Sequence, residues 1–300
     1  MTHRPLAFYL NPRGPQRREI MRALADAGIR LIGMDGCGWD AEKDRQEIDY
    51  FLADLATFGL AVQSMHGIPP LLARADADTP PDLLHALLQD IRRLALFKGK
   101  TAVYHACWMR DVPPERFDQA IDAAGWDAFV GRNARTLKLM AREAARHGIT
   151  VALENIWHSR RAQSVAGFAE ILRAAGEPNV AICLDSGHAH LAGAAVGEQI
   201  RAAGKLLRDT HFHDNAGPVG GRLFDQHIPP GLGTIDWQDA CRALDEIAFP
   251  GPVVFEGVLG PGDSIEGGRF GGRLSHKQLI DLSIANWRAF EALAMTRPPA

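Results

Sequence analysis

Short apolar runs alternate along the chain with longer stretches in which apolar residues recur every three or four positions. The short runs have the length and composition of buried strands, whereas the longer stretches have the periodicity of amphipathic helices. Strands are predicted at Leu6–Leu10, Ile29–Met34, Leu60–Met65, Thr101–His105, Ile149–Glu154, Val180–Asp185, Leu206–His213 and Pro252–Val258. Helices are predicted at Pro15–Ala27, Gln46–Phe58, Pro81–Phe97, Asp127–His147, Ser164–Ala175, Ala195–Ala203, Trp237–Ile247 and Ser275–Ala294.

This alternation favours a (β/α)8 barrel. Gly28, Gly59 and Gly148 each follow a predicted helix and precede a predicted strand, where a left-handed helix cap belongs. Eight strand–helix units within 300 residues fit a single α/β domain, residues 1–300, folded as a TIM barrel. A doubly wound open sheet is the alternative. It is disfavoured because the first strand is followed by the letters NPRG instead of a GxGxxG turn.

Composition narrows the function classes. Hydrophobic residues make up 46% of the chain and the net charge is -3, which gives no general attraction to nucleic acid or to an anionic membrane. No uncharged apolar run approaches the roughly 18 residues of a membrane span, and no secretory signal precedes the first strand. The four cysteines are far apart without a CxxC pair, which predicts reduced thiols in a cytoplasmic protein. The sequence leaves open whether the protein forms a homo-oligomer.

Imidazoles and carboxylates stand at the ends of consecutive predicted strands. In a parallel barrel the carboxyl ends of all strands surround one mouth, where the active sites of this fold lie. Alternation along a strand directs the last inward residue into that mouth. The residues that the third to eighth strands deliver there are His66, His105, Glu154, Asp185, His211 with His213, and Glu256.

Such a crowd of titratable side chains predicts a metal site. Carboxylates and imidazoles packed together would lose solvation at a cost of several kcal/mol unless a cation compensated them. The mixture of oxygen and nitrogen donors suits Mn²⁺, Zn²⁺, Co²⁺ or Fe²⁺ better than Ca²⁺. Each residue taken alone could have a purely structural role, as a hydrogen-bonded loop histidine or an ion-paired glutamate. That explanation is harder to sustain when six consecutive strands all deliver such residues.

Two further clusters add candidate ligands. His188 follows Asp185 by three residues, just inside the next loop, and Asp225 with His227 precedes a Pro/Gly stretch. That stretch turns the chain before the helix that opens near Trp237, and a loop of this kind could close over the mouth. An ordinary loop position is the other reading for Asp225.

These residues resemble the xylose isomerase-like TIM barrels, which include sugar phosphate isomerases and epimerases, ketose 3-epimerases and endonuclease IV. The resemblance covers the chain from the first strand to the closing helix. It rests on Leu153-Glu154-Asn155, Cys183-Leu184-Asp185-Ser186-Gly187-His188, His211-Phe212-His213-Asp214-Asn215, Pro230-Gly231-Leu232-Gly233-Thr234-Ile235-Asp236-Trp237 and Phe255-Glu256-Gly257. Together these motifs are specific for the superfamily and weakly specific for any one substrate.

The resemblance to epimerase-like members implies one divalent metal, and His188 contacting a substrate oxygen. The implied metal ligands are Glu154, Asp185, His211 and Glu256. The resemblance to endonuclease IV implies instead three zinc ions in a phosphodiester hydrolase. The implied ligands are then His66, His105, Glu154, Asp185, His188, His211, Asp225, His227 and Glu256.

Several departures from the endonuclease signature favour the single-metal reading. Asp-Thr-Cys-His is replaced by Asp185-Ser186-Gly187-His188, and the Asn-Asp-Ser/Ala-Lys run by the sequence that begins at His213. The segment from His211 to His227 is one residue longer, and the letters GIPP replace an aromatic wedge after the third strand. No nucleic-acid partner is expected, and a phosphodiesterase is the runner-up.

The leading hypothesis is a sugar, or sugar phosphate, isomerase or epimerase. Substrate oxygens would chelate the metal, which polarises a carbonyl and stabilises the enediolate left when a neighbouring proton is removed. Glu154 and Glu256 lie well apart around the ring, so one could remove the proton and the other return it. They could also be ligands only, with His188 or a metal-bound water moving the proton. A keto-sugar lyase could use the same groups.

Other side chains are candidates for binding the substrate. Trp108, Trp157 and Phe224 lie on loops expected at the mouth, where aromatic faces would suit the C–H face of a sugar or simply pack on the barrel. Arginines in the loops after the fifth and eighth strands could hold a phosphate or carboxylate, although solvated surface positions are the simpler reading. They are Arg160, Arg161, Arg269 and Arg273.

Overall fold

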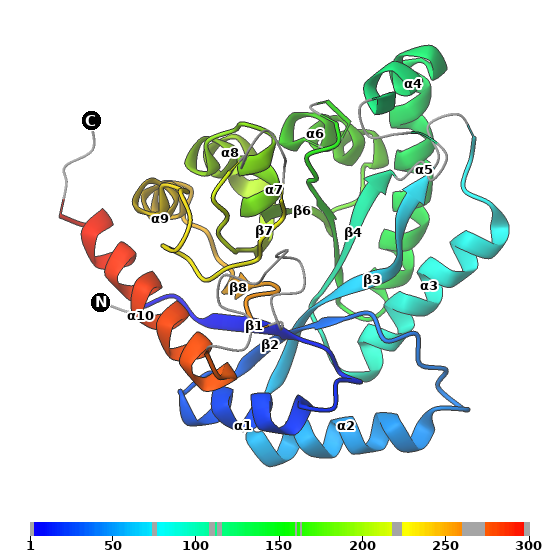
Figure 1. Ribbon diagram of the computed structural model, residues 1–300. Helices are drawn as coiled ribbons and strands as arrows, with labels where there is room; N and C mark the ends of the chain where they lie inside the picture. The colour runs from blue at the N-terminus through cyan, green and yellow to red at the C-terminus, as the bar shows by residue number, and fades with distance from the viewer. Residues whose placement is uncertain are drawn as a thin grey trace.

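Eight parallel strands form a nearly closed barrel with helices around its outside (Figure 1). The computed structural model describes residues 3–73, 77–107, 112, 116–159, 161–162, 164–217, 224–259 and 274–296. The strands are β1 Leu6–Leu10, β2 Leu31–Asp35, β3 Ala61–Ala73, β4 Thr101–Cys107, β5 Thr150–Glu154, β6 Val180–Asp185, β7 Leu207–His211 and β8 Val253–Phe255. From β1 to β7 each strand pairs with the next in sequence, and β8 returns to pair with β1. The predicted TIM barrel is confirmed.

The seam between β7 and β8 is closed by a few hydrogen bonds around Phe212. The Phe212 amide donates to Val254 O at 2.8 Å, and the Glu256 amide donates to Phe212 O at 3.3 Å. The Val254 amide donates to the Thr210 hydroxyl at 2.9 Å, so a side chain replaces one backbone acceptor. The seam thus has fewer backbone bonds than a regular ladder, and it lies between His211 and Glu256.

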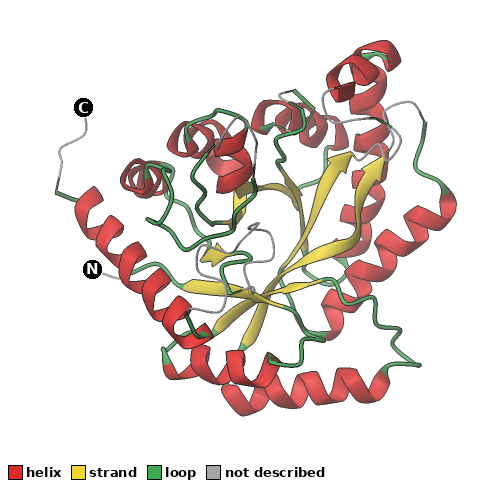
Figure 2. Ribbon diagram, viewed as in Figure 1, coloured by secondary structure: helices red, strands yellow, loops and turns green. Residues whose placement is uncertain are grey.

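The helices, which are red in Figure 2, follow the predicted order with two additions. They are α1 Arg17–Asp26, α2 Arg45–Phe58, α3 Pro81–Leu96, α4 Phe117–Ala124, α5 Trp126–Ala145, α6 Val165–Ala175, α7 Ser186–Leu191, α8 Val196–Ala203, α9 Trp237–Glu246 and α10 His276–Ala294. The prediction that His188 lies in a loop is wrong, because α7 begins directly after β6. Its N-cap is Asp185, whose carboxylate accepts a 2.7 Å hydrogen bond from the His188 amide. The other addition is α4.

The predicted helix caps are present. Gly28, Gly59 and Gly148 have φ angles of 79°, 63° and 66°. A residue with a side chain would be strained there, so glycine ends each helix and turns the chain into the next strand. No described helix is long and apolar enough to cross a membrane.

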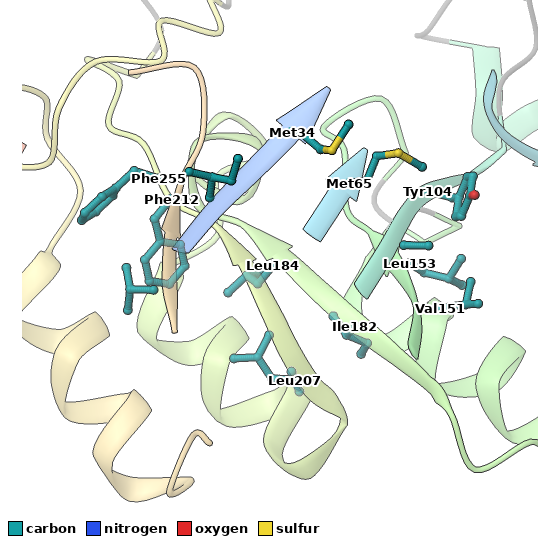
Figure 3. Packing of buried hydrophobic residues seen from close by; sticks show 14 of the residues in the cluster. Met34, Met65, Tyr104, Val151, Leu153, Ile182, Leu184, Leu207, Phe212 and Phe255 are labelled. Atoms are coloured by element: carbon teal, nitrogen blue, oxygen red, sulfur yellow. The ribbon is translucent and has the colours of Figure 1, made fainter. Parts of the chain in front are cut away.

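Alternation along the strands separates two layers of the core. Leu153, Ile182 and Leu184 pack with the helices in the main apolar cluster (Figure 3). Their neighbours Ala152 and Cys183 belong to a separate cluster of small residues between the strands. Since side chains two residues apart share a face, the positions that follow Ala152 and Cys183 on this inner face are Glu154 and Asp185. The inner face of β5 and β6 therefore carries small side chains below and ligating side chains at the mouth.

Asp214 holds the segment before α9 against the end of β7. Its buried carboxylate accepts hydrogen bonds from the Gly231 amide at 2.8 Å and the Trp237 indole at 2.8 Å. The Ile235 amide donates to it at 3.3 Å. This segment also carries His227, so the Asp214 carboxylate fixes the position of one side of the mouth.

Replacing Asp214 by Ala should leave these buried donors unpaired, at about 1–3 kcal/mol for each one that cannot reach water. The free energy of unfolding should fall by about 3–5 kcal/mol in denaturant titration. The control is Asp281→Ala, which removes an exposed carboxylate paired with Lys277 on α10 and should cost less than about 1 kcal/mol. Equal stabilities of the two variants would contradict the anchoring role.

Candidate metal centre

Strand register brings the predicted ligands to one level of the barrel. His105 is the register partner of Glu154, and Asp185 is the register partner of His211. Glu256 follows β8 directly, beside the seam with β7. His66 lies within β3, because this strand continues beyond its predicted end. These six side chains, from β3 to β7 and from the residue that follows β8, therefore converge at the mouth.

The central group consists of Glu154, Asp185, His211 and Glu256. One potential ligand atom from each residue lies within 4.8 Å of those from the others. His211 Nδ1 is 3.0 Å from Glu154 Oε1 and 3.2 Å from Glu256 Oε1. These four residues are the single-metal set that the sequence predicts, and the structure brings all of them together.

A second group, called here the β3–β5 group, consists of His66, His105 and Glu154. Glu154 Oε2 is 3.2 Å from His66 Nε2 and 3.8 Å from His105 Nε2. The Glu154 carboxylate therefore faces the central group with one oxygen and the β3–β5 group with the other. This is the geometry by which a carboxylate can bridge two cations.

A third group, called here the outer group, consists of His188, His213, Asp225 and His227. Asp225 Oδ2 is 3.1 Å from His188 Nε2 and 2.7 Å from His227 Nε2. His213 Nε2 is 3.6 Å from Asp225 Oδ1. Sequence reasoning placed His213 at the mouth with His211 but did not include it in either implied set of metal ligands. Whether the mouth holds one metal or several stays a prediction.

Asn155 positions Asp185 of the central group and His188 of the outer group through hydrogen bonds. Its side chain accepts from the Asp185 amide at 2.8 Å and donates to Asp185 O at 2.9 Å, which ties β5 to β6. Its own carbonyl oxygen accepts from His188 Nδ1 at 2.8 Å. Because a carbonyl only accepts, His188 carries a proton on Nδ1 and presents Nε2 to Asp225. Asn155 was part of the recognised motif, but sequence reasoning gave it no role.

Burial and mutual charge set the protonation of the metal-free groups. Burial alone would raise the pKa of Glu154, but His211 and His105 lower the pKa well below its usual value. Burial lowers the pKa of His105 to about 4, so its imidazole is neutral at pH 7. For His188, burial is outweighed by Asp185 and Asp225, which raise the pKa well above its usual value. Ionised carboxylates thus face a mixture of neutral and protonated imidazoles, which a divalent cation could replace as the compensating charge.

Buried polar atoms without hydrogen-bond partners indicate that the residues fit a metal ion. Within the described part of the chain these atoms include Glu154 Oε2, both ring nitrogens of His211 and Asp225 Oδ1. Unpaired buried acceptors are rare in proteins and call for an explanation such as a bound ion. Carboxylate oxygens with imidazole nitrogens are donors that suit Mn²⁺, Co²⁺ or Zn²⁺.

Backbone strain accompanies the outer group. His227 has a φ of 41°, in a region that residues with side chains seldom adopt. A Cβ atom on Gly257 would lie 2.0 Å from His227 Nδ1, so only glycine leaves room for this ring. Backbone strain at a residue whose ring needs a neighbouring glycine is typical of functional sites.

The predicted substrate-binding residues are only partly described. Trp157 lies at the mouth, with its ring 4.8 Å from that of His188. Arg161 instead lies 3.9 Å over the Trp126 ring and 3.7 Å from Asp122, on the outside of the barrel. Phe224 is half-buried. The remaining candidates, Trp108, Arg160, Arg269 and Arg273, lie outside the described residues.

Metal removal gives a direct test of the central group. Protein stripped with a chelator should gain about 4 kcal/mol of unfolding free energy when Mn²⁺, Co²⁺ or Zn²⁺ is restored at a thousand times its Kd. Glu154→Ala should abolish that gain, because Glu154 belongs to two groups. Elemental analysis measures the bound metal, and denaturant titration measures the free energy of unfolding. Glu246→Ala on α9, where the carboxylate contacts Arg201, is the control. A parent protein that is no more stable with metal would contradict the assignment.

Comparison with known proteins agrees with this architecture. A family model described as a xylose isomerase-like TIM barrel matches residues 21–269. The chain is 30% identical over 126 residues to an inosose isomerase of Bacillus velezensis, which is 41% of this chain and 45% of that protein. It is 28% identical over 163 residues to a D-psicose 3-epimerase of Agrobacterium fabrum, which is 54% of this chain and 50% of that protein. The alignments thus span about half the length of these relatives.

A solved structure of D-psicose 3-epimerase with D-tagatose, from Clostridium cellulolyticum H10, has the same fold. Its TM-score is 0.73, at 16% identity, over 97% of this chain and 99% of that chain. The family model covers most of the barrel, including every residue of the central group. The chain therefore belongs to the xylose isomerase-like TIM barrel family.

Proposed function

We propose that this protein is a metal-dependent isomerase or epimerase of a sugar or sugar phosphate. The observation that carries the proposal is that two carboxylates, those of Glu154 and Glu256, both contact His211 Nδ1, at 3.0 and 3.2 Å. The similarity to inosose isomerases and to D-psicose 3-epimerase supports an isomerase or epimerase acting on a polyhydroxylated ketone.

Proton transfer is the step that the two glutamates perform. A divalent cation in the central group would supply Lewis-acid polarisation of the substrate carbonyl. Glu154 or Glu256 takes the proton from the adjacent carbon, and the other glutamate returns a proton from the opposite face. Burial opposes the ionisation of Glu256, but His211 outweighs it and lowers the pKa of this carboxyl. Both groups are therefore ionised at neutral pH in the metal-free site, so either can act as the base. The glutamate that returns a proton must first take one up, from solvent or from a substrate hydroxyl.

Other residues at the mouth would bind and orient the substrate. His188, held by the Asn155 carbonyl oxygen, presents Nε2 toward the mouth and can contact a substrate oxygen. The Trp157 ring beside it offers an apolar face to the C–H side of a sugar. Glu154 and Asp185 are buried, so their carboxylates reach the mouth from a site with little exposure to solvent.

Deuterium exchange tests the two-glutamate mechanism. In D₂O, a panel of ketopentoses, ketohexoses and inososes, with their phosphates, should include one substrate that gains deuterium beside its carbonyl as it is converted. Glu154→Gln and Glu256→Gln should each lower kcat by at least about 100-fold, because each removes one proton-transfer group. NMR measures the exchange and chromatography the product.

The outcome of the exchange experiment separates the reaction classes. Glu246→Gln, on the outer surface of α9, is the control and should keep the parent rate. Exchange followed by loss of water would indicate a lyase. Conversion without deuterium incorporation would contradict the enediolate mechanism.

A phosphodiester hydrolase related to endonuclease IV is the second candidate. The β3–β5 group and the outer group favour it, because a single-metal isomerase needs only the central group. Two or three close metals can activate water and stabilise a leaving oxygen. All nine residues that the endonuclease resemblance implies as ligands are members of the three groups.

Assays with nucleic acid distinguish this second candidate. With a net charge of -3, the purified protein should bind an abasic-site duplex weakly at about 0.15 M salt, where counterion release contributes less than at low salt. Binding is measured by fluorescence anisotropy and cleavage by gel electrophoresis, with Zn²⁺ restored. Duplex cleavage at catalytic rates, together with three Zn²⁺ per chain, would replace the isomerase by the hydrolase.

A further inference from the structure

The carboxylate of Asp185 is held by two donors. Its Oδ1 accepts from the His188 amide at 2.7 Å, because Asp185 is the N-cap of α7. The His213 ring is the second donor, with Nε2 3.1 Å from Oδ1 and 3.0 Å from Oδ2. A carboxylate only accepts, so Nε2 carries the proton and is shared between the two oxygens. Asp185 and His213 are both fully buried, which strengthens a hydrogen bond between them.

The strand pairing that gathers the ligands also brings His213 to Asp185. Asp185 ends β6, and its register partner on β7 is His211. His213 lies two residues beyond that partner, so it shares the inner face with His211, whereas Phe212 between them packs in the main apolar cluster. The same segment therefore supplies one ligand of the central group and a donor to a second ligand on the neighbouring strand.

The His213 ring is fixed in its orientation. It stacks on the ring of His227, with centroids 3.8 Å apart and planes 6° from parallel. A Cβ atom built on Gly187 would lie 2.0 Å from His213 Cε1. Gly187 belongs to α7 and its φ is outside the left-handed region, so the backbone does not need glycine, which is a poor helix former. Room for the His213 ring is what the absent side chain provides.

We propose that His213 is a positioning residue, which orients the Asp185 carboxylate toward the divalent cation of the central group. The inference rests on the proposed function, because that function requires a cation there. A carboxylate without such donors can turn about its terminal bond, whereas hydrogen bonds to a ligating carboxylate direct its remaining lone pairs toward the metal. His213 acts through Asp185 and is not a ligand itself, because its Nε2 proton is donated to that residue.

The proposal also gives the outer group a role that needs no cation of its own. His227 Nε2 is 2.7 Å from Asp225 Oδ2, and this contact holds the ring on which His213 stacks. Contacts therefore run without a break from Asp225 through two imidazoles to Asp185. The outer group would in this way support the geometry of the central group.

The test is the affinity of chelator-stripped protein for Co²⁺, measured without substrate by competition with a chromophoric chelator. His213→Phe keeps a ring to stack on His227 but has no donor. It should weaken Co²⁺ binding about 10–100-fold and shift the visible absorption of bound Co²⁺, with the parent number of ions at saturation. His213→Gln, whose amide can donate to Asp185, should recover part of the affinity. His190→Phe, which replaces a ring on α7 that contacts Thr234, is the control and should keep the parent affinity.

Gly187→Ala tests the space for the ring without changing His213. Its Cβ should displace the ring and weaken Co²⁺ binding to a similar extent. In a His213→Ala protein, where the space is vacant, adding Gly187→Ala should have no further effect, because both changes act on the same contact. The control is Gly131→Ala, where a Cβ would make only an ordinary contact with Arg135. Thermal unfolding of the metal-free variants identifies any that fail to fold.

Three results would overturn the positioning role. Parent affinity in His213→Phe and Gly187→Ala would show that Asp185 keeps its orientation without the ring. Equal losses in His213→Phe and His213→Gln would show that the donor has no part in it. Loss of a whole ion at saturating Co²⁺ would make His213 a ligand. The isomerase proposal is tested separately, by exchange at the substrate carbon, so a protein that binds Co²⁺ as expected but exchanges no deuterium would contradict the isomerase alone.

Discussion

The mouth of this barrel is organised around one desolvated carboxylate. The Glu154 side chain is only 1% exposed, yet ring nitrogens of four histidines approach it at 3.0–3.8 Å, from His66, His105, His188 and His211. An uncompensated carboxylate in such a place would cost several kcal/mol. The surrounding strands must therefore deliver imidazoles or a cation to this point. Small inward side chains below, such as Ala152 on β5, leave the space that this arrangement fills.

The barrel and the gathering of strand-end imidazoles and carboxylates at its mouth could be predicted from sequence because both follow from periodicity. The choice of the four central residues as the ligands of one metal came from the family resemblance. Alternation on β5 and β6 puts Glu154 and Asp185 on the inner face, and parallel connection puts all strand ends at one mouth. Periodicity did not predict the short helices. Helix α7 spans only six residues and contains Gly187, so its sequence has no amphipathic period, and its N-cap is a residue already assigned as a ligand.

Contacts between segments distant in the chain were beyond sequence reasoning. Gly187 and His213 were each visible as departures from a signature, but only the structure shows that one glycine makes room for the other residue's ring. The division of the candidate ligands into three groups likewise depends on side-chain direction. Spacing placed His227 near the mouth, whereas its left-handed backbone and its stacking on His213 determine which carboxylate it faces.

The sparsely bonded seam between β7 and β8 has a consequence for the barrel as a mechanical object. His211 ends one of these strands and Glu256 follows the other, with their side chains 3.2 Å apart across the gap. A cation bound by both residues would link β7 to β8 at the point where the barrel has the fewest backbone hydrogen bonds. Loss of the ion would then be felt as faster amide hydrogen exchange along Leu207–His211 and Val253–Phe255, ahead of the rest of the sheet.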